Sequence, residues 1–101
     1  MELYRGDSFI KKIVSNYTFQ IGDKIHIAVL KNAYSREYLH EQEVEIQSEG
    51  DEFIIEILPS KTSKFPNEKL LLEIELTTVN GFVKTEQYDL IVKADGIYER
   101  N

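Results

Sequence analysis

The stretch 69-KLLLEIELTTVNGFVKTEQYDLIVK-93 holds two alternating runs of apolar and polar residues on either side of Asn80-Gly81. Such alternation is the period of a β-strand with one buried face. Asn-Gly between two strands favours a type I′ turn, because both central residues of that turn need positive φ. The stretch therefore predicts a hairpin at the centre of the fold, and its buried face includes Leu72, Ile74, Leu90 and Val92.

Four other segments alternate in the same way and predict further strands: Glu2–Val14, Lys24–Leu30, Tyr38–Gln47 and Glu52–Leu58. A bend or bulge is expected at Gly6 in the first of them. The Glu49-Gly50-Asp51 turn predicts a second hairpin, at Gly50, between the third and the fourth. The start of the third strand is ambiguous, since residues 35–41 also fit a helical turn. The expected core side chains of these strands are Ile25, Ile27, Val29, Val44, Ile46, Phe53, Ile55 and Ile57.

The segment between the fourth strand and the central hairpin is polar. Pro59 stops the strand, and residues 60–67 cross to the hairpin with a short helical turn around 61–65. Phe65 is expected to close one end of the core. The tail 94–101 is polar except for Ile97 and Tyr98.

Six or seven short strands with regular turn signals predict one all-β domain over residues 1–101. We expect an antiparallel two-sheet sandwich, with an immunoglobulin-like topology as the leading interpretation. The sequence contains no Cys and no Trp, so it lacks the Cys-Trp-Cys set of antibody domains.

Composition limits the partners. The formal net charge is -6, with carboxylates spread along the strands, so a phosphate backbone would be repelled and nucleic acid is not expected as a partner. Residues 1–6 have no apolar signal-like region, and no apolar run approaches the length of a membrane helix, so no membrane contact is expected. The lack of Cys excludes thiolate catalysis and Cys-ligated zinc.

No set of residues predicts catalysis. His26 and His40 are far apart in sequence and fit no metal-ligand spacing, and no serine lies in a nucleophile motif. The pairs Glu43/Glu45 and Glu73/Glu75 could imitate an acid–base pair, but their alternation with core residues favours a solvated face. The Glu49–Glu52 cluster lacks the ligand ladder of a calcium loop. We therefore expect no enzyme, no catalytic residue, no cofactor and no metal.

The chain has six tyrosines, a residue type favoured at protein interfaces. Tyr34 and Tyr38, on either side of Arg36 in a polar segment, are candidates for a partner contact. The alternative is that these tyrosines pack over the rim of the sandwich.

The order of several motifs resembles a known family. These motifs are Tyr4-Arg5-Gly6-Asp7-Ser8-Phe9, Gly22-Asp23-Lys24-Ile25, the run Phe53–Leu58 followed by Thr62, Leu72–Leu76, Asn80-Gly81, Thr85 and Leu90–Val92. Together they are similar to the small immunoglobulin-like virion domains of tailed phages and Gram-positive prophages, above all to the N-terminal domain of upper baseplate proteins. Two positions depart from that pattern: Phe19–Asp23 replaces an Asp-Leu-Thr-Gly turn, and Asn67–Leu70 replaces a Gly-x-Tyr.

The resemblance implies a non-catalytic structural module of a baseplate or tail that acts in virion assembly through protein–protein contacts. Its partners would be further copies of itself, as a homo-oligomer, or another virion protein. Such a protein is made in the bacterial cytoplasm and ends in the virion. The alternative class is a small ligand- or carbohydrate-binding β-sandwich, which the absence of Trp disfavours.

Overall fold

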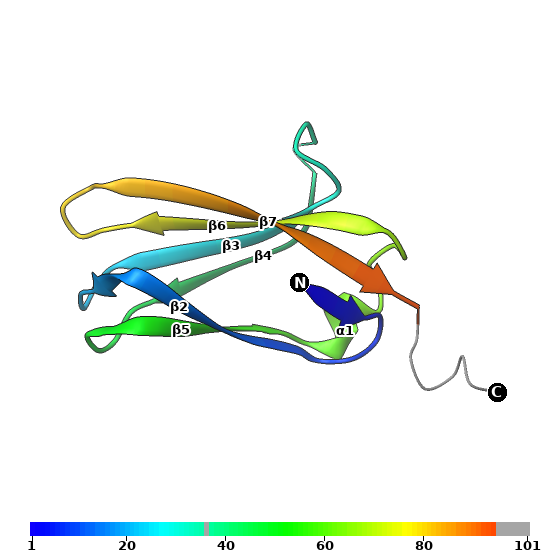
Figure 1. Ribbon diagram of the computed structural model, residues 1–101, viewed down its shortest axis with the longest axis horizontal. Coiled ribbons are helices and arrows are strands. Elements are labelled where there is room, and N and C mark those ends of the chain that lie inside the picture. The colour runs from blue at the N-terminus through cyan, green and yellow to red at the C-terminus, as the bar shows by residue number, and fades with distance from the viewer. Residues whose placement is uncertain (36, 95–101) are drawn as a thin grey trace.

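The computed structural model describes residues 1–35 and 37–94, and it is an all-β fold with one short helix (Figure 1). The order of elements is β1 (Glu2–Tyr4), β2 (Phe9–Phe19), β3 (Lys24–Leu30), β4 (Tyr38–Glu45), β5 (Gly50–Ile57), α1 (Pro59–Thr62), β6 (Lys69–Thr77) and β7 (Val83–Lys93). Five strands form one sheet in the order β1-β7-β6-β3-β4, and β2 pairs with β5 in a second sheet. The predicted all-β class and the two sheets are confirmed.

One hydrophobic core lies between the two sheets. The even-numbered residues of β6 and the odd-numbered apolar residues of β3 and β5 are buried, as period 2 requires. The four core residues predicted for the central hairpin are all buried. At the middle outward positions of β6 and β7, polar side chains pair across the strands: Glu73 accepts a hydrogen bond from Gln87 Nε2 at 3.0 Å, and Glu75 accepts one from the Thr85 hydroxyl at 3.4 Å.

The turn of the central hairpin differs from the prediction. Among the described residues only glycines have positive φ, so Asn80 does not adopt the conformation that a type I′ turn needs. The loop instead spans residues 78–82: the Gly81 amide donates to the Thr78 carbonyl at 2.9 Å, and Gly81 has φ of 87°. Strand pairing gives the reason. A two-residue loop at Asn80-Gly81 would place Leu72 opposite Asp89, whereas the longer loop places it opposite Tyr88, on the same buried face.

The predicted first strand, Glu2–Val14, is two strands that belong to different sheets. Gly6, with φ of 89°, lies in the tight turn that separates β1 from β2, and β2 continues to Phe19. β1 runs parallel to the last strand, with Leu3 opposite Val92. The five-stranded sheet is therefore mixed, and the expectation of a purely antiparallel sandwich is wrong in this detail.

The second predicted hairpin is also wrong. β4 pairs with β3, and β5 pairs with β2 in the other sheet, so the segment around Gly50 crosses between the sheets instead of turning back within one. Ile46 guides the crossing: its side chain is buried, and its amide donates to the carbonyl of Asp23 at 2.8 Å. β4 begins at Tyr38, so the helical-turn alternative for residues 35–41 does not hold for the described part of that range.

The connection from β5 to β6 contains a short helix as predicted, but the helix lies about two residues earlier than expected: α1 spans Pro59–Thr62 instead of 61–65. Phe65 is buried at the end of the core, as predicted. The hydroxyl of the buried Thr62 donates to the carbonyl of Asp7 at 2.7 Å, which ties the helix to the β1–β2 turn. Ile97 and Tyr98 of the predicted tail lie outside the described residues. In the part of the chain that the structure describes, no helix has the length and apolar character needed to cross a membrane.

Candidate functional site

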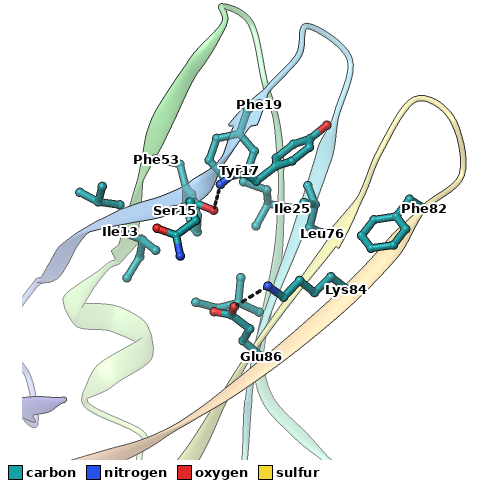
Figure 2. A pocket seen from close by; sticks show the side chains of 13 residues that line it. Ile13, Ser15, Tyr17, Phe19, Ile25, Phe53, Leu76, Phe82, Lys84 and Glu86 are labelled. Atoms are coloured by element: carbon teal, nitrogen blue, oxygen red, sulfur yellow. Dashed lines mark hydrogen bonds and ion pairs between the residues drawn. The ribbon is translucent and has the colours of Figure 1, made fainter.

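A groove of about 530 Å³ lies between β2 and the hairpin of β6 and β7 (Figure 2). Its floor is apolar and consists of buried core side chains, among them Phe19, Phe53 and Ile74. The pairing of β2 with β5 shifts register between Val14 and Phe19, so β2 is irregular where it borders the groove. The lining residues are Ile13, Val14, Ser15, Asn16, Tyr17, Phe19, Ile25, Phe53, Ile74, Leu76, Phe82, Lys84 and Glu86.

The wall formed by β7 is charged. Lys84 Nζ lies 3.4 Å from Glu86 Oε1, and the Tyr88 hydroxyl donates a hydrogen bond to Glu86 Oε2. That hydrogen bond, together with nearby Lys84, lowers the pKa of Glu86, although partial burial opposes the shift. The same hydrogen bond raises the pKa of Tyr88, and burial adds to this effect. The wall therefore presents one cation and one anion at neutral pH.

Beside this wall, β7 has a free hydrogen-bonding edge. β1 covers only Ile91–Lys93, where the Ile91 amide donates to the Met1 carbonyl at 2.8 Å and the N-terminal ammonium donates to the Asp89 carbonyl at 3.0 Å. Backbone groups of alternate residues point to the same side of a strand. The amides and carbonyls of Val83, Thr85 and Gln87 therefore face this open side, where no described strand pairs with them.

Asp23 fixes the loops at one end of the groove. Its side chain is fully buried, and Oδ2 accepts hydrogen bonds from the Gln20 amide at 2.9 Å and the Tyr17 hydroxyl at 3.1 Å. Oδ1 accepts from the Val79 amide at 3.0 Å, in the β6–β7 loop. One carboxylate thus joins the end of β2, the β2–β3 loop and the β6–β7 loop, and it sets the position of the Tyr17 ring against the groove.

The pKa values of the Asp23 carboxylate and the Tyr17 phenol shift in opposite directions. Burial of Asp23 would raise its pKa, but the hydrogen bonds from Gln20, Val79 and Tyr17 favour the ionised form and lower the pKa overall. Desolvation raises the pKa of Tyr17, and the hydrogen bond to the Asp23 carboxylate and its negative charge add to the increase. At neutral pH the pair is an ionised carboxylate with a neutral phenol, which is a structural arrangement and not a proton-transfer pair.

The two histidines lie apart from the groove. His26 Nε2 is 3.3 Å from Glu41 Oε2, and its ring makes an edge contact with Tyr38, with ring centres 6.2 Å apart. His40 Nε2 is 2.6 Å from Gln42 Oε1 on the edge strand β4. Each ring contacts a neighbouring polar side chain, and the structure does not bring the two together on one site.

The paired carboxylates lie on the outward face of the five-stranded sheet. Glu73 and Glu75 accept hydrogen bonds from Gln87 and Thr85, and Glu43 lies 3.8 Å from the ammonium of Lys24. In the cluster Glu49–Glu52, Glu52 forms an ion pair with Lys12 at 3.1 Å. Across residues 1–35 and 37–94, no group of three or more His, Asp or Glu side chains could hold a metal ion.

The two tyrosines predicted as candidates for a partner contact are Tyr34, on the β3–β4 loop, and Tyr38, at the start of β4. Tyr34 is 95% exposed, and the loop is held by Asn32 Oδ1, which accepts hydrogen bonds from the amides of Tyr34 and Ser35 at 2.9 Å each. Arg36 lies outside the described residues. This loop is at the opposite end of the sheet from residues 78–82, because Leu30 pairs with Leu71 and Lys24 with Thr77 (Figure 1).

Sequence reasoning missed the groove and its charged wall. The signal was present, since Lys84 and Glu86 have the same parity as the buried Leu90 and Val92 and should therefore face inward. Charged residues at inward positions indicate that this half of the strand lies at an uncovered edge. Comparisons with protein-family models, curated proteins and solved structures gave no match to the chain. The function therefore rests on the chain's own geometry.

Proposed function

We propose that this chain is a non-catalytic structural module that acts through protein–protein contacts in the assembly of a phage or prophage virion, of baseplate or tail type. The observation that carries the proposal is the edge of β7 from Val83 to Gln87, which pairs on its open side with no described strand and lies next to an apolar groove. A strand edge of this length is a template for pairing with another chain. The virion context is supported by the motif order from Tyr4 to Val92.

The proposal includes an immunoglobulin-like topology. In that fold one sheet contains the adjacent strands C, F and G, and strands B and E belong to the other. Here β3, β6 and β7 are neighbours in one sheet and β2 pairs with β5, so these strands match C, F, G, B and E in chain order. β4, at the edge next to β3, takes the place of the additional strand C′ of variable-type domains.

Several features support a role without catalysis. The two histidines contact different carboxyl and amide neighbours, and the carboxylate pairs face solvent in cross-strand hydrogen bonds. The fully buried carboxylate of Asp23 accepts hydrogen bonds that hold the loops together. In this proposal the protein needs no cofactor, is made in the bacterial cytoplasm, and associates with itself or with another virion protein.

The proposal is tested with particles. A lysogen carrying the gene is induced, particles are purified by density gradient, and the chain is sought by mass spectrometry in particle and soluble fractions. We expect the chain in the particles, at a fixed ratio to a tail or baseplate protein. Its recovery only in the soluble fraction would contradict a virion role.

The groove itself favours a second candidate function, binding of a small ligand or carbohydrate. Its volume lies within the range of ordinary ligand sites, roughly 300–1,000 Å³. Phe82 is 61% exposed and lines the groove beside Lys84, so an aromatic face and a charged pair are available together. Binding on a glycan array that is abolished by Phe82→Ala, but not by a change of the exposed Tyr34 to Ala, would support this alternative.

A further inference from the structure

We propose that the free edge of β7 pairs with the same edge of a second copy of this chain, antiparallel and centred on Thr85, to form a two-fold dimer. The inference rests on the proposed function and deepens it, because it names one contact through which the module associates. The two five-stranded sheets would join into one continuous sheet across the axis.

The backbone of β7 is suited to this pairing. The position beside the strand is filled by β1 next to Ile91–Lys93 and by the N-terminal ammonium at the Asp89 carbonyl, and it is open, within the described residues, next to residues 83–88. With Thr85 on the axis, Thr85 faces its own copy, and Val83 faces Gln87 of the second copy. These are the residues whose amides and carbonyls point to the open side, so each of these pairs exchanges two main-chain hydrogen bonds.

The side chains are complementary in the same register. Between the hydrogen-bonded pairs lie non-hydrogen-bonded pairs, in which side chains come closest. Lys84 then faces Glu86 of the second copy, and by symmetry Glu86 faces Lys84. Phe82 faces Tyr88, so an exposed aromatic ring meets a half-buried one at each end of the interface. Opposite charges at the centre and aromatic pairs at the ends both favour association.

Neighbouring registers lose this match. If the axis moves to Val83, Lys84 faces Phe82, and if it moves to Gln87, Lys84 faces Leu90. If it moves to Glu86, two like charges face each other, and the backbone groups on the axis are those already directed at β6. The dimer therefore has one preferred alignment, which is the condition for a defined interface instead of edge-to-edge aggregation.

The length of the open edge also fits. In the proposed register Asp89 of one copy faces Gly81 of the other. The β7 strand of the second copy therefore reaches its β6–β7 turn just before the point where β1 of the first copy covers β7. Met1 closes that end of the site through its contacts with Asp89 and Ile91. Phe82 lines the groove beside the edge, so this ring has space on the inner face of the extended sheet (Figure 2).

Disulfide trapping tests the register directly, because the native chain contains no Cys. A hydrogen-bonded antiparallel pair has Cα atoms about 5.5 Å apart, within the range for a disulfide. Thr85→Cys should therefore give a covalent dimer under mild oxidation. Gln87→Cys is the matched control, since its two copies would lie roughly 13 Å apart along the strand direction. Equal cross-linking of the two variants would overturn the proposed register.

A charge exchange tests the contact without new covalent bonds. Lys84→Glu and Glu86→Lys each create two like-charge pairs across the two-fold axis. Each should raise the dissociation constant of the dimer by roughly tenfold or more, as measured by light scattering or sedimentation. The double variant Lys84→Glu/Glu86→Lys should restore it. Lys24→Glu, which makes the same change in charge on the outward face of β3, should leave the dimer intact. Thermal unfolding of each variant checks that the fold persists.

The results separate this inference from the proposed function. A wild-type chain that stays monomeric at the highest soluble concentration, or a double variant that fails to recover association, would overturn the β7 dimer. If that monomer is still found in purified particles, the virion role stands through a different contact. If the Thr85 dimer forms and the chain never enters particles, the dimer holds and the proposed function fails.

Discussion

Asp23 shows how one buried charge can organise several loops. Its oxygen atoms accept hydrogen bonds from Tyr17, Gln20 and Val79, and its own backbone pairs with Gln20 and Ile46. A buried carboxylate is tolerated only when its hydrogen-bonding capacity is met in this way. No buried side-chain polar atom of the described residues lacks a partner.

Asp23→Asn is expected to destabilise the fold by about 2–4 kcal/mol at neutral pH, because the amide cannot accept all three hydrogen bonds and turns a donor toward other donors. The pKa of Asp23 is lowered, so its stabilising effect is present above the ordinary carboxyl pKa of 3.8 and is lost as pH falls through the folded-state value. Denaturant unfolding at neutral and acidic pH should show the gap between wild type and variant shrinking on acidification. Asp51→Asn, on an exposed position, is the control.

A gap that stayed constant from neutral pH to well below the ordinary pKa would show that Asp23 does not act through its charge. A larger loss for Asp51→Asn than for Asp23→Asn would contradict the hydrogen-bond assignment itself.

At Gly22, glycine is needed for both space and conformation. It has φ of 94°, and an added Cβ would lie 3.0 Å from Val79 Cγ1. Gly22→Ala is therefore expected to cost about 1–2 kcal/mol for the backbone alone. Gly50→Ala meets nothing within 4 Å, and Gly50 is not among the positive-φ residues, so it should be neutral or slightly stabilising. Chemical denaturation of the two variants should rank them in this order.

Among the elements, the β6–β7 hairpin shows what alternation can and cannot predict. The parity of the apolar residues correctly assigned the buried face of both strands. Even-numbered core residues on both sides of the turn also require an odd number of loop residues, which excludes the two-residue Asn-Gly turn. The parity of the core residues therefore already determines that the loop has an odd number of residues, and it outweighs the local preference of Asn-Gly for a two-residue turn.

The partners of the strands were not predictable in the same way. Alternation in Glu52–Leu58 has the same period whether the strand turns back on β4 or crosses to β2. The crossing depends on contacts distant in sequence, such as the amide of Ile46 with the carbonyl of Asp23. The division of the first segment at Gly6 depends on the open edge of β7 accepting β1. Apolar alternation alone does not locate the groove, because Lys84 and Glu86, which border it, are charged residues with the same inward parity as Leu90.

Ile74→Ala is expected to destabilise the protein by about 2–5 kcal/mol, since it removes methyl groups from the core face of the strand between β3 and β7. Glu73→Ala removes only an exposed hydrogen bond to Gln87 and should change stability little. Equilibrium urea unfolding compares the two. The reverse ranking would mean that β6 is assigned one residue out of register.

For the whole molecule, the unequal size of the two sheets sets a condition on folding. The second sheet has only the strands β2 and β5, and an isolated two-stranded sheet is marginal in water. Its buried residues, including Phe9, Ile55 and Ile57, belong to the same cluster as Ile25 and Leu72 of the larger sheet. Neither sheet can bury its apolar face without the other, which predicts one cooperative unit.

This prediction is tested with one variant in each sheet. Ile55→Ala and Leu72→Ala both truncate fully buried side chains. Each should lower the free energy of unfolding by about 2–5 kcal/mol, and each should shift the midpoint of the whole, single unfolding transition. Far-ultraviolet circular dichroism and tyrosine fluorescence should give coincident curves. Native-state hydrogen exchange should show the most protected amides of the β2–β5 pair opening with the same free energy as those of β3 and β6. If the β2–β5 amides exchange at a distinctly lower free energy, the small sheet opens on its own, and the groove beside it opens with it.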